Sequence, residues 1–253
     1  MNADRLPASG KRTVTIAAIL LLSLTVRAGT AVAADSFSAG MTAYEAGDFD
    51  RAATFFADSA DAQPASGTFL NLGNAEWKRD RTAGAILAWE RTLWLNPHDK
   101  HAKNNLALAR DVAQLESPQL AWHEIASTWL PATAWVWIAV GSLWLTGAML
   151  VLPGIFRARK ASWHQAVAAL GLGVFILSLP ANLGVITRSG IGFITAMETP
   201  LRLTPTSNAE TVTRLAAGEP VRWVRSRGNY SFIRTSHAEG WIERGELELI
   251  RGR

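Results

Sequence analysis

Two long stretches without a charged residue, 132–152 and 165–187, constrain what this chain can fold into more than any other feature. As helices rising 1.5 Å per residue, both are long enough to cross a hydrocarbon core of ~30 Å. Helices of soluble proteins usually keep a polar stripe, and these stretches have none. We therefore expect two transmembrane helices, at 132–152 and 164–187. A buried helical pair inside a soluble domain is the alternative.

The segment between the two stretches, 153–163, carries a cluster of cations. Arg157, Arg159 and Lys160 lie close together after Pro153. Short loops rich in Lys and Arg remain on the cytoplasmic side of a membrane. The pattern predicts a transmembrane hairpin with a cytoplasmic turn, so the chain before it and the chain after it lie together on the opposite side.

The N-terminal residues 1–34 have the three parts of a secretory signal peptide. Arg5, Lys11 and Arg12 precede an apolar run over 14–26, and small residues follow. A cleaved signal peptide and an uncleaved anchor both send the next segment across the membrane. The expected location is the inner membrane of a bacterium, with both soluble parts of the chain in the periplasm.

Residues 35–116 contain a repeat with a constant spacing of 33 residues. The repeated positions are a small residue, an aromatic residue and a proline, namely Ala52 and Ala85, Phe56 and Trp89, and Pro64 and Pro97. A small residue lets two helices approach, the aromatic side chain fills the space beside it, and proline ends the second helix. This pattern resembles the tetratricopeptide repeat. We expect an all-α solenoid of two repeats with a capping helix begun by Asp99, followed by a linker at 117–131.

A solenoid of this kind presents a groove that binds other proteins. The groove candidates are Asn71, Asn74, Trp77, Lys78 and Asn105, because amide side chains can hold a peptide backbone as donor and as acceptor. Asn74 and Asn105 match two asparagines with which some tetratricopeptide domains clamp a C-terminal carboxylate. The accompanying cations have no evident counterpart, so we expect a protein-binding groove without that clamp. Alternatively, these asparagines only cap helices or face solvent.

Beyond Thr187 the composition changes to short alternating segments separated by turn signals. The segments are, in order, 201–205 (Leu-Arg-Leu-Thr-Pro), 215–221 (Leu-Ala-Ala-Gly-Glu-Pro-Val), 228–230 (Gly-Asn-Tyr) and 240–242 (Gly-Trp-Ile). This order resembles the bacterial SH3 domain, which implies a small all-β barrel over 196–251. Trp223, Tyr230 and Trp241 are the candidate binding surface of the barrel, with a place in its core as the alternative.

The whole order of segments resembles the BatE-like proteins of the Bat aerotolerance clusters. The second repeat carries the closest local match, at 71–75 (Asn-Leu-Gly-Asn-Ala) and 85–91 (Ala-Ile-Leu-Ala-Trp-Glu-Arg). The resemblance implies von Willebrand A-type proteins and other Bat-cluster membrane proteins as partners, together with a MoxR-type ATPase system in stress or aerotolerance.

Several kinds of chemistry have no support in the sequence. There is no cysteine, which excludes thiol catalysis and cysteine-ligated metals. We find no phosphate-binding loop, nucleophile elbow or dinucleotide motif, and no histidine with a carboxylate at a familiar ligand spacing. The cations are scattered, which argues against nucleic acid. We expect no catalytic residue, metal or cofactor, but a membrane-anchored adaptor that binds proteins; a peptidoglycan-binding membrane protein is the alternative.

Overall fold

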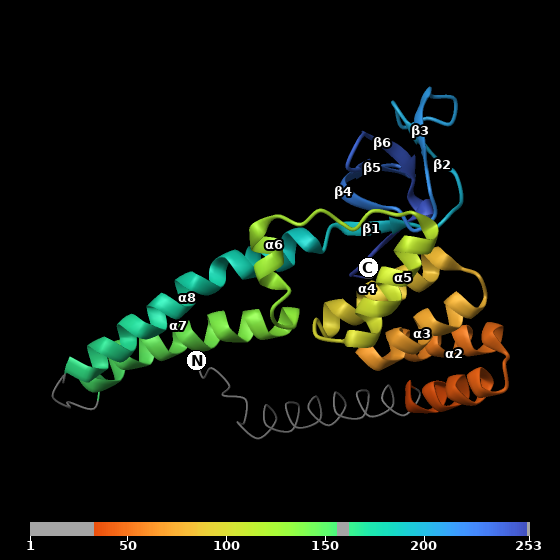
Figure 1. Cartoon of the computed structure of the whole chain (residues 1–253). Helices are drawn as coiled ribbons and strands as arrows, with labels where there is room; N and C mark the ends of the chain where they lie inside the picture. The colour runs from red at the N-terminus through yellow and green to blue at the C-terminus, as the bar shows by residue number, and fades with distance from the viewer. Residues whose placement is uncertain (1–32, 156–161, 252–253) are drawn as a thin grey trace, which may run out of the picture.

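The computed structural model describes residues 33–155 and 162–251, and it shows a helical part, a two-helix hairpin and an antiparallel sheet (Figure 1). Apart from residues 33–34, the expected signal peptide lies outside the described residues. The cation cluster of the expected turn, 157–160, also lies outside them.

The helical part consists of antiparallel helices joined by short turns. It comprises residues 33–45, α2 (Phe49–Ala62), α3 (Ser66–Lys78), α4 (Thr82–Leu95) and α5 (Lys100–Ala113). The carboxylates of Asp48 and Asp99 accept hydrogen bonds from backbone N–H groups in the first turns of α2 and α5. These caps satisfy donors that the helix itself leaves unpaired, so they explain where both helices begin.

Two glycine contacts show that both helix pairs are packed in the same way. A Cβ atom added to Gly40 would lie 2.7 Å from the ring of Phe56, and one added to Gly73 would lie 2.5 Å from the ring of Trp89. Both rings are almost completely buried. Each aromatic side chain therefore lies directly on a glycine backbone. The two contacts are separated by the spacing of the sequence repeat.

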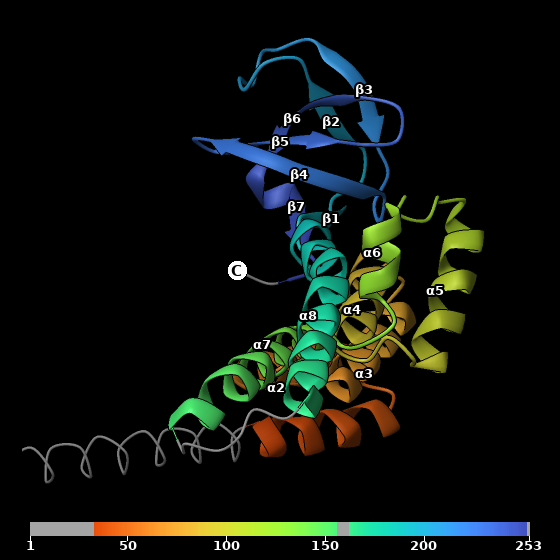
Figure 2. The same ribbon diagram turned by 90° about the vertical axis from the view of Figure 1, so that its left-hand side faces the viewer.

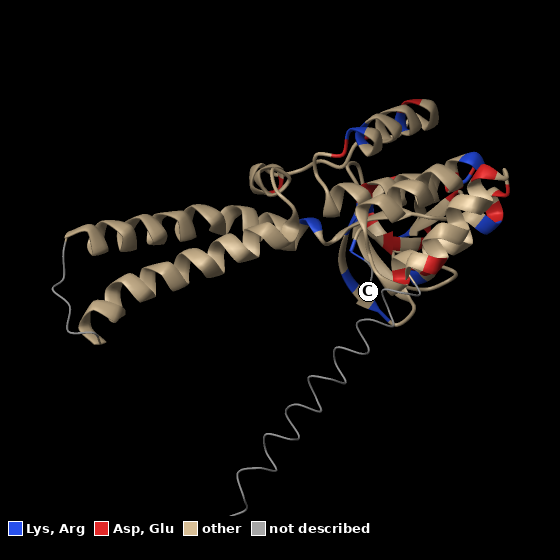
Figure 3. Cartoon of the chain, turned by 90° about the horizontal axis from the view of Figure 1, so that it is seen from below, with Lys and Arg blue, Asp and Glu red and all other residues tan. Residues whose placement is uncertain are grey.

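The hairpin is formed by α7 (Ala132–Ile155) and α8 (Ser162–Arg188), which cover both uncharged stretches. The two helices pack through small residues, since Gly171 lies against Thr146 and Thr146 Oγ1 donates to Ala168 O over 3.3 Å. Within the described residues, these two helices are long and apolar enough to cross a membrane. Only 17% and 22% of their most apolar windows are buried. Figure 3 shows that α7 and α8, as far as the structure describes them, carry no Lys, Arg, Asp or Glu before Arg188.

The C-terminal part is one seven-stranded antiparallel sheet with the strand order β3-β2-β6-β5-β4-β1-β7. The strands are β1 (Ile191–Ile194), β2 (Thr199–Arg202), β3 (Thr211–Leu215), β4 (Pro220–Arg227), β5 (Tyr230–Arg234), β6 (Glu239–Glu243) and β7 (Leu247–Leu249). The sheet begins at Ile191, directly after α8 and before the expected boundary at 196. The core on one face of the sheet contains Leu201, Ile233 and Ile242.

The expected closed barrel is wrong, because β3 and β7 are the two edges of the sheet and do not pair with each other. Instead, the side chain of Arg91 on α4 binds residues at the β7 edge. Its guanidinium donates to the carbonyl oxygens of Leu249 and Ile250 over 3.1 and 3.3 Å, and to Glu248 Oε2 over 3.1 Å. The helical part therefore supplies two hydrogen bonds to backbone carbonyl oxygens at the end of this edge.

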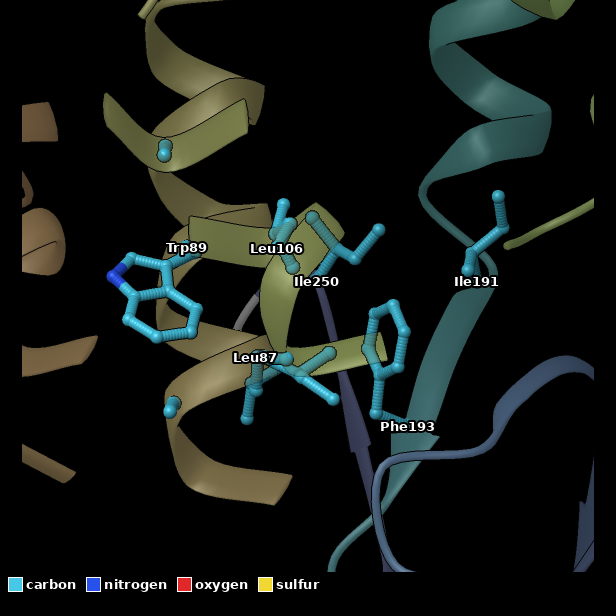
Figure 4. Close-up of a cluster of buried hydrophobic side chains, with 10 residues drawn as sticks. Leu87, Trp89, Leu106, Ile191, Phe193 and Ile250 are labelled. Atoms are coloured by element: carbon cyan, nitrogen blue, oxygen red, sulfur yellow. The ribbon is translucent and has the colours of Figure 1, made fainter. Parts of the chain in front are cut away.

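The helices and the sheet share one hydrophobic core (Figure 4). Leu87 and Trp89 of α4 and Leu106 of α5 pack with Phe193 of β1 and with Ile250 after β7. Figure 2 shows β1 and β7 on the side of the sheet nearest the helices. The sheet thus covers the α4 side of the helical part, and the two parts form a single packed unit at one end of the hairpin.

Candidate functional site

Asn74 of α3 and Asn105 of α5 meet on one face of the helical part. Asn74 Oδ1 accepts from Trp89 Nε1 over 3.2 Å and from Asn105 Nδ2 over 2.9 Å. An indole N–H can only donate, so Asn74 must turn its oxygen inward and Asn105 must turn its nitrogen toward Asn74. Among the described residues, Asn74 Nδ2 and Asn105 Oδ1 have no hydrogen-bond partner and are not buried. The pair therefore presents one donor and one acceptor.

The other groove candidates differ in their surroundings. Asn71 is half-buried and donates to Met41 Sδ in helix 33–45 over 3.4 Å. Trp77 is half-buried against the shared core, with its ring centroid 6.0 Å from that of Trp89. Lys78 is exposed at the end of α3. Asn71 and Asn74 of α3 and Asn105 of α5 thus form an amide row on two helices, whereas Trp77 packs against Trp89 in the core.

Of the three aromatic residues expected to form a binding surface on the sheet, one is buried and two are half-buried. Trp241 is only 7% exposed and packs edge-on against Phe232, with ring centroids 5.2 Å apart. The Arg225 guanidinium covers both rings, at 5.2 and 5.5 Å from their centroids. Trp223 and Tyr230 are half-buried, and Trp223 Nε1 donates to a neighbouring serine on β4. Trp241 is therefore packed on the sheet rather than open for stacking on a ligand.

A cleft of about 420 Å³, which the sequence did not predict, lies between the end of α5 and the sheet. Its walls come from α5, the segment after it, β1, β4 and the β5–β6 turn. They include Leu115, Glu116, Pro118, Ile191, Glu219, Arg222, Arg234 and His237. His237 Nε2 lies 3.5 Å from Glu116 Oε1. No local motif could have revealed this cleft, because its walls are distant in the sequence and meet only through the shared core.

An ion pair with a buried carboxylate joins the sheet to the short helix that precedes the hairpin. Glu124 lies in α6 (Trp122–Ser127), within the expected linker, and is only 1% exposed. Its two oxygens accept from Arg222 Nη1 over 2.8 Å and from Arg222 Nη2 over 3.0 Å, and one also accepts from the Ala121 N–H. Burial raises the pKa of Glu124, but the hydrogen bonds from Arg222 and Ala121 outweigh it and the net pKa lies below its ordinary value.

This ion pair predicts a loss of stability in acid. A carboxyl group with a lowered folded pKa stabilises the fold above its unfolded pKa, and that contribution is lost as the pH falls through the folded pKa. Glu124→Gln should lower the free energy of unfolding by about 1–2 kcal/mol at neutral pH, the lower range for charged hydrogen bonds because Arg222 is partly exposed. The difference in the free energy of unfolding between wild type and variant should shrink below pH 4.5, which is the ordinary pKa of a glutamate carboxyl group. Urea titrations at several pH values measure this.

The exposed pair Glu198–Arg214 provides the control for that titration, because its side chains are 77% and 67% exposed. Glu198→Gln should change the free energy of unfolding by less than about 0.5 kcal/mol at any pH. If the free energy of unfolding differs between wild type and Glu124→Gln by the same amount at neutral and at acid pH, the charge of Glu124 does not stabilise the fold.

Within residues 33–155 and 162–251, no group of three His, Cys, Asp or Glu side chains lies close enough to hold a metal ion. His98 Nε2 lies 2.9 Å from the Trp129 carbonyl oxygen, a contact between the helical part and the start of the hairpin. In comparisons with known proteins, no family model, curated protein or solved structure matches this chain.

Proposed function

We propose that this protein is a non-enzymatic adaptor, anchored in a membrane by α7 and α8, that binds another protein through the amide row Asn71, Asn74 and Asn105. One observation carries the proposal. Trp89 fixes the Asn74–Asn105 pair so that an unused amide donor and an unused carbonyl acceptor remain on one face. A peptide backbone needs one of each at every residue. Because the pair is held by a buried indole, little side-chain entropy is lost when it binds.

The equivalent contacts Gly40–Phe56 and Gly73–Trp89 support the interpretation of the helical part as two tetratricopeptide-like repeats. In that arrangement helix 33–45, α3 and α5 form the binding face, and α2 and α4 form the outer layer. The sheet packs on the α4 side, so it leaves the amide row uncovered. A BatE-like role with von Willebrand A-type partners belongs to this proposal and rests on the order of sequence motifs.

The proposed anchor places the helical part and the sheet on the same side of the membrane. Both are joined to the same end of the hairpin, the helical part through α6 and the sheet through the direct connection from α8 to β1. The cations at 157–160 argue for a cytoplasmic turn and hence for a periplasmic location of the packed unit. Anchoring raises the local concentration of membrane-bound partners, so modest affinity is sufficient.

The test of the proposal is Asn74→Asp. Aspartate keeps an oxygen for Trp89 and Asn105 but replaces the free amide donor with a second acceptor. The variant should remain folded and recover its partner at least about tenfold less well. The loss of one hydrogen bond, together with repulsion between the new carboxylate and a carbonyl oxygen of the partner, should weaken the free energy of binding by about 1.4 kcal/mol or more. Affinity purification from detergent extracts with quantitative mass spectrometry measures the recovery.

Asn208→Asp is the matched control, because it adds the same charge at an exposed site in the β2–β3 loop. It should recover the same partners as wild type. If Asn74→Asp stays folded by circular dichroism and recovers its partners as well as Asn208→Asp does, the amide row is not the binding face.

A further inference from the structure

The short helix α6 has two opposite faces with different chemistry. Its inner face is fixed to the rest of the protein by Glu124, which binds Arg222, and by Ser127, whose Oγ accepts from Arg188 Nη1 over 3.0 Å. Both residues are 1% exposed. In addition, Trp135 Nε1 at the start of α7 donates to Ser127 O over 3.1 Å. α6 is therefore a rigid part of the protein and not a loose linker.

The outer face of α6 is apolar and exposed. Trp122 and Ile125 are 70% and 50% exposed, and their spacing of three residues puts them on one side of α6. Trp129, in the turn that follows α6, is 63% exposed. The one Asp, Glu, Lys or Arg within 122–129 is Glu124, which is buried on the inner face. In a soluble environment this much clustered apolar surface would be unfavourable, so the face requires a cover.

The position of α6 indicates what covers it. The helix packs beside the last turns of α8, where Gly184 allows the backbone contact: a Cβ atom there would lie 2.1 Å from the His123 carbonyl oxygen. The same end of α8 exposes Leu183 and Ile186, by 52% and 68%. The apolar face of α6 is thus continuous with the proposed lipid-facing surface of the hairpin. Tryptophan side chains favour the boundary between lipid and water.

We propose that α6 is a third membrane element, which lies in the headgroup region of the outer leaflet with Trp122, Ile125 and Trp129 in contact with lipid. This inference rests on the proposed membrane anchor. Because Glu124 holds Arg222 of the sheet, a helix fixed at the lipid surface also fixes the orientation of the whole packed unit. The helices and the sheet then rest directly on the bilayer instead of moving on a flexible tether.

Site-directed spin labelling of the full-length protein tests this, because the absence of native cysteine makes each introduced cysteine unique. Ile125→Cys is the test site. Val112→Cys on α5, 64% exposed, is the matched apolar site away from the hairpin, and Leu177→Cys on α8, 79% exposed, reports on the span itself. Labelled protein is placed in vesicles of phosphatidylethanolamine and phosphatidylglycerol. The accessibility of each label to oxygen and to a water-soluble nickel chelate is then measured.

We expect the label at 125 to show a ratio of oxygen to nickel accessibility between the ratios of the other two labels, which corresponds to the headgroup region. If the label at 177 is in lipid but the label at 125 matches the label at 112, the α6 proposal is overturned while the anchor stands. If the label at 177 is itself in water, the anchor fails and the α6 proposal fails with it.

Discussion

Gly73→Leu should lower the free energy of unfolding by about 3 kcal/mol or more, at or above the upper end of the usual cost of overpacking. The first atom of any side chain at this position would lie 2.5 Å from the Trp89 ring, which is itself buried and cannot move aside. Displacing Trp89 would also break its hydrogen bond to Asn74. The amide row should therefore lose its fixed geometry along with the stability of the fold.

Gly67→Leu is the control for this prediction, because it lies in the same helix with open space around its Cβ position. Leucine has a higher helix propensity than glycine, so this variant should be neutral or more stable by up to about 1 kcal/mol. Denaturant titrations of the full chain in detergent, followed by tryptophan fluorescence, compare the two variants. Equal stability of Gly73→Leu and Gly67→Leu would contradict the glycine–indole contact and the repeat built on it.

Gly184→Leu should separate α6 from α8 and also cost about 3 kcal/mol or more. Here the obstacle is the His123 backbone carbonyl, at 2.1 Å from an added Cβ, so no side-chain rotation can relieve the clash. The displaced α6 would leave the buried Arg188 and Glu124 with weaker partners, which adds to the cost.

Gly173→Leu on the same helix has open space at its Cβ position and should behave as wild type. Thermal unfolding in detergent measures both variants, and a labelled cysteine at 125 reports the position of α6. A Gly184→Leu protein that melts with wild type would show that α6 does not pack closely on α8.

The parts of the fold that sequence analysis predicted are those encoded by local patterns. The uncharged stretches predicted α7 and α8 because composition alone determines whether such a helix needs an apolar environment. Asp99 indicated the start of α5 because a cap acts within one turn. Alternating residues predicted the strands but not whether the outer two would pair, and Arg91 of α4 provides hydrogen bonds at the edge where closure was expected.

The candidate site was predictable only in part, for the same reason. Asn71, Asn74 and Asn105 could be placed on one face from the repeat. The internal bonds that leave Asn74 with a free donor depend on Trp89 and on a partner 31 residues away. Glu124 and Arg222 are 98 residues apart, and neither has a local signal. Their pairing follows only from the shared core that brings β4 to α6.

The most direct measurement of the central claim is site-specific photocrosslinking in living cells from residue 104, an exposed position on α5 next to Asn105. A photoreactive residue there should join the chain to a defined partner protein, and Asn74→Asp should remove that adduct. The same photoreactive residue at Thr54, exposed on α2, should give no such adduct. A 104 adduct that persists unchanged in Asn74→Asp, or that forms equally from position 54, would contradict partner binding at the amide row.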